Sequence, residues 1–323
     1  MWKNLWTLGG ENHWGLRMRT RGTRGLFATQ DIPPGARILE IPEEHLMTIE
    51  SVYDRNPSIR KVYPHKAQMN DRVIYHLYQL LTGAVKPTPS EKIYLSSLPK
   101  DVSNFCLFYD KNNVLRPLKG TCFSRQNPDP NDLFHSIDNY RMHYDHTMDQ
   151  LGIPHETMDA YRKSTVMVNS RVFQFHDGKK ERMGLVPIAD LINHHNHDEV
   201  NTTWYFDADK RVFVVQATRV IPSGAQVYDS YGQKNDLQLL YTYGFYMPEN
   251  EYGNIIIPRP HGQQDLVIPR HVSLGRSTQH MNTQDQRCIR GYIARLYKIL
   301  KSISPEHPLR QLLHDQHEFL NKN

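Results

Sequence analysis

The chain has 323 residues, 38% of them hydrophobic and 23% charged, which is typical of a globular protein with a sizeable core. Its net charge of +5 permits nucleic-acid contact without calling for it, so we expect an ordinary charged surface. It contains 3 cysteines and no CxxC pair, which excludes a cysteine-rich zinc cluster. Cysteine usage this sparse predicts an intracellular protein, cytoplasmic or nuclear, with import into an organelle left open. No apolar run approaches the roughly 20 residues that cross a membrane, and we expect a monomer.

Short strands are predicted in two separate regions of the chain. Residues 15–20, 25–30 and 36–42 have strand patterns, and residues 204–232 add further strands around the turns "DADK" and "IPSG". The segments "ATQDIPPGARILEI" and "ATRVIPSGAQVYDS" share Ala-Thr, two residues, Ile-Pro-x-Gly-Ala and a following strand. We interpret them as a pseudo-repeat that builds a β-rich scaffold.

Helical patterns occupy the middle and the end of the chain. Helices are predicted at residues 70–85, 89–99, 131–152 and 154–173, and two amphipathic helices at 283–304 and 308–322. The sequence therefore predicts an α+β protein. Its β-rich scaffold is split by a helical insertion, and a short helical tail follows.

The segment "ADLINHHNHDEVN" at residues 189–201 is rich in histidine. His194, His195 and His197 could ligate a metal, but their HHxH spacing lacks the register of the known zinc motifs. Neighbouring residues of a strand point to opposite faces, which separates His194 from His195. We therefore expect no metal. A GxSxG motif, which would indicate a serine hydrolase, is also absent from the sequence.

A block of tyrosines, "VYDSYGQKNDLQLLYTYGF", spans residues 227–245. Alone it would indicate an aromatic core. It follows "RGTRGLFATQDIPPGARILEIP" and "LVPIADLINHH" in the order found in SET domains. The chain resembles that family over about residues 15–250, and more narrowly the branch typified by the Rubisco large-subunit methyltransferase. The segments "KIYLSSLP" and "LRPLKGT" also resemble this branch.

The resemblance implies a SET fold of short strands with a pseudoknot-like C-terminal segment. It places the SET domain at residues 1–250, with the helical insertion at about 55–165, and a short helical extension at 251–323. Relatives usually carry a larger helical docking domain there. The resemblance also implies a transferase that moves a methyl group from S-adenosylmethionine to a lysine of a non-histone protein.

The resemblance carries cofactor contacts onto particular residues of this chain. The family arginine that meets the cofactor carboxylate matches Arg171, and Asp190 would orient the loop that carries the Asn-His motif. Where the family commonly has Gly-x-Gly, this chain has Thr23-Arg24-Gly25. The implied cofactor-binding residues are Thr23, Arg24, Gly25, Arg171, Asp190, Asn193, His194 and Tyr231.

Tyr231 matches the catalytic tyrosine of the family, and Tyr243 matches a second tyrosine that shapes the channel for the acceptor. Two further positions bear on the acceptor, because a related branch methylates histidine and carries asparagine and tryptophan there. This chain has Phe173 and Ala189, which suit the aliphatic stem of a lysine. Histidine methylation and a non-catalytic SET-like binding module stay open as alternatives.

Overall fold

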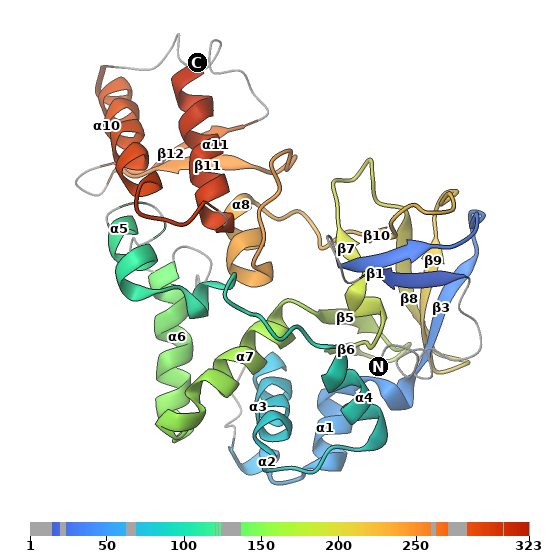
Figure 1. Cartoon of the computed structure of the whole chain (residues 1–323). Helices are drawn as coiled ribbons and strands as arrows, with labels where there is room; N and C mark the ends of the chain where they lie inside the picture. The colour runs from blue at the N-terminus through green and yellow to red at the C-terminus, as the bar shows by residue number, and fades with distance from the viewer. Residues whose placement is uncertain are drawn as a thin grey trace. The chain divides into compact units, whose positions relative to one another are not determined.

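The computed structural model describes residues 15–19, 24–62, 69–119, 121, 123, 137–259, 263–270, 283–305 and 307–322. The chain divides into two compact units, each built from two separate stretches. The first unit comprises Met1–Lys100 and Pro154–Gly232, and the second comprises Asp101–Ile153 and Gln233–Asn323. The predicted α+β class is confirmed, with short strands in small sheets beside helices (Figure 1).

The first unit contains three small sheets and one parallel strand pair. β1 (Leu16–Arg19) pairs with β2 (Gly25–Ala28), and the order of the second sheet is β3 (Arg37–Pro42), β9 (Val212–Ala217), β8 (Thr202–Asp207). The third sheet contains β4 (Met47–Thr48), β6 (Glu181–Leu185) and β5 (Val172–His176). The parallel pair is β7 (Asn193–His194) with β10 (Tyr228–Asp229).

The predicted pseudo-repeat is a pair of segments that bond each other reciprocally. The amide of Ile32 donates to the carbonyl of Ile221, and the amide of Ile221 donates back, each at 2.9 Å. Gly35 donates to Ala217 while Gly224, its counterpart, donates to Ala28, both at 2.8 Å. Both glycines have a positive φ, 80° and 85°, in the region that favours glycine. The shared Ile-Pro-x-Gly-Ala motif therefore encodes two turns that bond each other, one also bonding the end of β9 and the other the end of β2.

The helices of the first unit pack beside the sheets. They are α1 (Ile49–Arg55), α2 (Ile59–Val62), α3 (Met69–Thr82), α4 (Pro89–Ser97) and α7 (Met158–Asn169), with the 3-10 turns η2 (Glu43–His45), η6 (His155–Thr157) and η7 (Ala189–Leu191). α3 packs along α7, and Val73, Ile74 and Leu77 of α3 are buried. The helix predicted over 154–173 ends earlier than expected. Val172 and Phe173 begin strand β5, because β6 supplies hydrogen-bonding partners for the extended chain.

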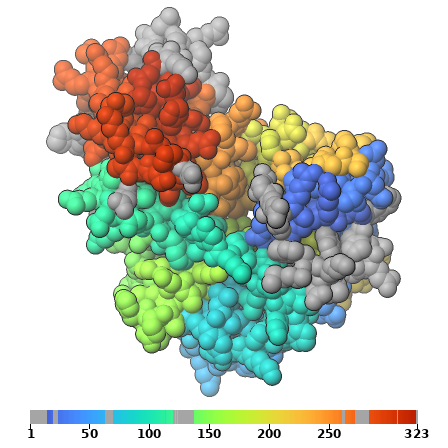
Figure 2. All heavy atoms as spheres, viewed as in Figure 1, coloured from blue at the N-terminus to red at the C-terminus, as the bar shows by residue number. Residues whose placement is uncertain are grey.

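The second unit is mainly helical. It contains α5 (Arg116–Leu118), α6 (Ile137–Gln150), α8 (Asp236–Gln238), α10 (Thr283–Leu300), α11 (Pro308–Lys322), the 3-10 turn η3 (Cys106–Phe108) and the π-helices η4 (Lys111–Leu115) and η8 (Leu239–Tyr243). α10 and α11 lie where two amphipathic helices were predicted, and they pack against each other; Figure 2 shows their outer surface in red. The sequence interpretation missed a hairpin, β11 (Asn254–Ile257) with β12 (Leu266–Pro269).

The helices of the described part of the chain are too short or too polar to cross a membrane. The division into a domain at residues 1–250 and an extension at 251–323 stays a prediction.

Candidate functional site

The parallel pair β7–β10 brings the Asn-His motif (Asn193 and His194) beside the start of the tyrosine block, at Tyr228 and Asp229. Asn193 lies opposite Tyr228, and His194 lies opposite Asp229. Asn201 fastens this arrangement, since its side chain donates to the carbonyl of Gln226 at 3.0 Å and accepts from the amide of Tyr228 at 2.9 Å. Residues 226–231 are thereby held beside residues 192–194, and the site is formed within the first unit.

His194 and Tyr231 form a stacked pair. Their ring centroids are 5.1 Å apart with an interplanar angle of 20°. The amide of Tyr231 donates to Nδ1 of His194 at 3.1 Å, so that nitrogen carries no proton. The hydroxyl of Tyr231 donates to the carbonyl of Ile192 at 2.8 Å. These two hydrogen bonds fix the tyrosine at both ends, through its backbone and its phenol.

Asn193 and Gly25 meet closely. The side-chain amide of Asn193 donates to the carbonyl of Arg24 at 2.7 Å. A Cβ atom on Gly25 would lie 2.7 Å from Nδ2 of Asn193 and 2.6 Å from Nε2 of Gln226, which is closer than real Cβ contacts. An alanine at position 25 would therefore displace the side-chain ends of Asn193 and Gln226, which meet strand β2 at this point.

Arg171 and Asp190 form a buried ion pair next to this contact. Nη1 of Arg171 lies 3.0 Å from Oδ2 of Asp190 and also donates to the carbonyl of Asp190 at 2.9 Å. The side chains are 14% and 0% exposed, so little water screens the pair. Burial would lower the pKa of Arg171, but the charge of Asp190 outweighs it, and the net shift of that pKa is upward. Arg171 stays positively charged.

Two more side chains complete this cluster, which we call the arginine cluster: Arg24, Tyr94, Arg171 and Asp190. The hydroxyl of Tyr94 donates to Oδ2 of Asp190 at 2.8 Å, and burial together with the charge of Asp190 raises the pKa of Tyr94 well above its usual range. A guanidinium nitrogen of Arg24 donates to the carbonyl of Ser97. Burial and the neighbouring Arg171 lower the pKa of Arg24. The cluster holds two cations against one carboxylate, so an anion there would be stabilised.

Two residues of the arginine cluster, Arg171 and Asp190, each have a buried polar atom with no partner in the described part of the chain. Nε of Arg171 and Oδ1 of Asp190 are buried and have no hydrogen-bond partner among the described residues. Burying an unsatisfied donor and acceptor costs free energy unless something else bonds them. Ile188, just before η7, has a positive φ of 71°, a strained conformation for a β-branched residue. Unsatisfied polar groups and backbone strain in one place are typical of a ligand site.

The other predicted site residues, Phe173, Ala189, Tyr243 and Thr23, stay predictions. Phe173 packs edge-on against Trp204 and Phe213, with centroids 5.4 Å and 5.2 Å away, and Ala189 is fully buried in η7. Tyr243 ends the π-helix η8 in the second unit, near Phe245. Thr23 lies outside the described residues.

The histidine-rich segment divides between two roles. His194 belongs to the stacked pair with Tyr231, whereas the ring of His195 lies against Tyr228 at 4.8 Å. Across the residues that the structure describes, no three His, Cys, Asp or Glu side chains gather as metal ligands would.

Sequence reasoning missed Tyr94, Trp204 and Asp229. Tyr94 lies within the quoted segment "KIYLSSLP", but a helical pattern alone marks it as a core residue. Asp229, which is 6% exposed, directly follows Tyr228 in the tyrosine block, and a hydrogen bond from Trp204 reaches its carboxylate. The signal that could have identified Asp229 is an acidic residue directly after Val227 and Tyr228.

A family model described as "SET domain" matches residues 23–232. The chain belongs to the SET-domain family. The match spans β2 to Tyr231 and so includes the Asn-His motif, the arginine cluster and the tyrosine. The resemblance expected from the sequence is confirmed.

Curated relatives of this SET-domain chain are called actin-histidine N-methyltransferase. The proteins from Canis lupus familiaris, Homo sapiens and Mus musculus are each 26% identical over 249 residues, which is 72% of this chain. The match covers 40% of the dog protein and 39% of the human and mouse proteins, so the chain spans about 40% of the length of these relatives.

Solved SET structures resemble the chain as well. The SET domain of LSMT bound to lysine and AdoHcy superposes with a TM-score of 0.63 at 14% identity, covering 99% of this chain and 88% of that one. Rubisco LSMT bound to AdoMet gives 0.60 at 15% identity, with coverages of 99% and 88%. At such identities the likeness shows the SET fold.

Proposed function

We propose that this chain is an S-adenosylmethionine-dependent protein methyltransferase that acts on a lysine side chain of a non-histone protein. The observation that carries the proposal is the arginine cluster. Its buried donor on Arg171 and buried acceptor on Asp190 have no hydrogen-bond partner among the described residues. These atoms fit the carboxylate and the ammonium of the amino-acid end of S-adenosylmethionine. The two LSMT structures, one bound to AdoHcy and the other to AdoMet, agree with this class of ligand.

The remaining contacts suit the same cofactor. Gly25 permits a ligand to approach the backbone of strand β2, and Asn193 ties that strand to the Asn-His motif. When bound, S-adenosylmethionine supplies a methyl group on a sulfonium sulfur that is already a good leaving group. The residues of the chain therefore need only to position the acceptor and exclude water.

Tyr231 is suited to orient an amine. Its proton is engaged with the carbonyl of Ile192, so the phenol oxygen can accept a hydrogen bond from the acceptor. A lysine amine has an ordinary pKa of about 10.4. Burial beside a positive charge lowers that pKa, which makes the neutral amine accessible near neutral pH.

The choice of lysine depends on Phe173 and Ala189. The ring of Phe173 belongs to an aromatic group with Trp204 and Phe213, and it offers no hydrogen-bonding atom to an imidazole. An apolar wall of this kind suits the methylene stem of lysine. The role that the resemblance implies for Tyr243, in shaping the acceptor channel, stays a prediction.

Histidine methylation is the second candidate function. The curated relatives favour it, since they are actin-histidine N-methyltransferases. At 26% identity the acceptor can differ between relatives. A non-catalytic SET-like module would share the fold and lack turnover.

Mass spectrometry of a methylated extract separates these candidates. The purified chain is incubated with a cell extract and S-adenosylmethionine carrying a deuterated methyl group, with the Tyr231→Phe variant as the control. We expect labelled lysine peptides with the wild type and few with the variant. Label on histidine alone would replace the lysine proposal by the second candidate. Absence of label with the wild type would favour the binding module.

A further inference from the structure

Tyr94 connects the helical insertion to the arginine cluster. It lies on α4, is 2% exposed, and its hydroxyl donates to Oδ2 of Asp190 at 2.8 Å. The same carboxylate oxygen receives Nη1 of Arg171 at 3.0 Å. Oδ2 is thus held from two sides, by a neutral donor and by a cation.

The phenol can act only as a donor in this contact. Burial and the charge of Asp190 raise the pKa of Tyr94, so its proton is retained at neutral pH. Because the proton points at Oδ2, the orientation of the Asp190 carboxylate depends on where the Tyr94 ring lies. The side-chain placement of Arg171 depends in turn on that carboxylate.

Helix α4 holds the Tyr94 ring in place. Thr88 and Glu91 form a capping box at its first turn, with the Thr88 amide donating to Glu91 at 2.7 Å. Glu91 also contacts His76 of α3 at 3.2 Å and Arg55 of α1 at 3.4 Å. Hydrogen bonds from His76 and Thr88 outweigh burial and lower the pKa of Glu91 to about 2, so it remains charged. The start of α4 is therefore tied to two other helices.

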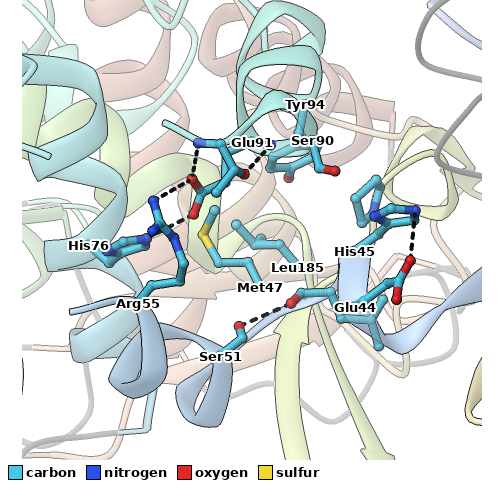
Figure 3. A pocket seen from close by; sticks show the side chains of 13 residues that line it. Glu44, His45, Met47, Ser51, Arg55, His76, Ser90, Glu91, Tyr94 and Leu185 are labelled. Atoms are coloured by element: carbon cyan, nitrogen blue, oxygen red, sulfur yellow. Dashed lines mark hydrogen bonds and ion pairs between the residues drawn. The ribbon is translucent and has the colours of Figure 1, made fainter. Parts of the chain in front are cut away.

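A cavity of about 270 Å³ lies beside the start of α4, and Glu91 is among the residues that line it. Figure 3 shows Met47 and Leu185 near its middle, with Glu91, Arg55 and His76 gathered to one side. Tyr94 lines the same cavity. The hydrogen bond to Asp190 holds the polar end of the ring.

We propose that Tyr94 is a positioning residue that sets the affinity for the carboxylate of the cofactor by holding Asp190 and, through it, Arg171. This inference rests on the proposed function. It assigns a role in cofactor binding to a residue of the helical insertion, outside both the Asn-His motif and the tyrosine block.

The test compares Tyr94→Phe with a matched control, Tyr78→Phe. Tyr78 is also a buried tyrosine of the first unit, and its hydroxyl bonds Thr157 at 2.9 Å, away from the arginine cluster. Calorimetry measures the binding of S-adenosylmethionine and of 5′-methylthioadenosine, which has the nucleoside but no amino-acid end. Each variant removes one oxygen atom, and thermal melting checks that the fold is kept.

We expect Tyr94→Phe to bind S-adenosylmethionine about tenfold more weakly, as removal of a hydrogen bond to a charged group predicts. Its affinity for 5′-methylthioadenosine should match the wild type, and Tyr78→Phe should bind both ligands normally. In a double variant with Arg171→Met, the loss should not exceed that of Arg171→Met alone.

Two results would overturn the role of Tyr94. One is unchanged affinity of Tyr94→Phe for S-adenosylmethionine, and the other is an equal loss for both ligands, which indicates a general packing defect. A wild type that binds neither ligand would instead contradict the proposed function itself, so the two failures are distinguishable.

Discussion

Gly25 lies where a larger side chain would meet its neighbours in the site. A Cβ atom there would lie 2.6 Å from Gln226 and 2.7 Å from Asn193. We predict that Gly25→Ala weakens S-adenosylmethionine binding at least tenfold and lowers the free energy of unfolding by about 1–3 kcal/mol, the usual range for overpacking. Calorimetry and chemical denaturation measure the two effects. An alanine variant with normal affinity would mean that this approach does not matter for binding.

Tyr231 is expected to act on turnover rather than on cofactor binding. Its hydroxyl bonds Ile192, whereas its backbone amide holds His194, and phenylalanine removes only the first contact. We predict that Tyr231→Phe keeps the affinity for S-adenosylmethionine and lowers the methylation rate about a hundredfold, as loss of positioning does. A rate assay on a labelled substrate peptide checks this. Equal rates would remove the assigned role.

Asp229 makes stability depend on pH. Burial, partly offset by hydrogen bonds from Ser230 and Trp204, raises its pKa from 3.8 to about 6. Between these values the folded state binds a proton that the unfolded state does not, so stability rises as the pH falls. From pH 7.5 to pH 5 this contribution amounts to about 1 kcal/mol.

The prediction is tested with Asp229→Asn, which cannot titrate. Urea denaturation at both pH values should show the wild type gaining about 1 kcal/mol relative to the variant at the lower pH. Parallel stability curves for the two proteins would contradict the raised pKa of Asp229.

At the scale of elements, α10 contains a glycine without a structural need. A Cβ on Gly291 would meet nothing within 4 Å, and the residue lies inside an 18-residue helix. We predict that Gly291→Ala raises the free energy of unfolding by about 0.5–1 kcal/mol, the helix-propensity difference. It should leave cofactor affinity unchanged, which makes it a control for Gly25→Ala. Destabilisation by Gly291→Ala would contradict the packing described for α10.

Elements with a strong local signal could be predicted from the sequence. The Ile-Pro-x-Gly-Ala motif of the pseudo-repeat predicted its two turns. Helices α3, α10 and α11 lie where apolar spacing predicted them. The helix predicted to 173 was wrong at its end, because pairing with β6 overrides the helical pattern of Val172 and Phe173. The hairpin β11–β12 was not predicted, although Ile255, Ile256 and Ile257 are strong strand formers.

The candidate site was predictable where motifs are contiguous. Asn193 and His194 pair with Tyr228 and Asp229, and Arg171 forms an ion pair with Asp190. The SET resemblance named Arg171, Asp190, Asn193 and His194, but these pairings were not predicted. Tyr94 could not be found in this way. Its link to Asp190 spans 96 positions and depends on the register of α4, which sequence spacing does not reveal.

At the scale of the whole molecule, each unit is assembled from two separate stretches of chain. The described site residues of the Asn-His motif and the arginine cluster belong to the first unit, so a ligand bound there should stabilise it by mass action. We predict that S-adenosylmethionine at 100 times its Kd raises the free energy of unfolding of the first unit by about 2.7 kcal/mol. Hydrogen exchange of amides in β2 and β7 measures this directly. Protection unchanged by the ligand would place binding elsewhere.

The most direct test of the central claim is a calorimetric titration of S-adenosylmethionine into the wild type, Asn193→Ala and Asn56→Ala. Asn193 bonds the carbonyl of Arg24 at the site, whereas Asn56, at the end of α1, bonds Gln79 of α3 at 2.6 Å. We predict one binding site in the wild type, at least tenfold weaker binding for Asn193→Ala, and normal binding for Asn56→Ala. A wild type that shows no binding, or binding that Asn193→Ala leaves intact, would contradict the assignment of this site to the cofactor.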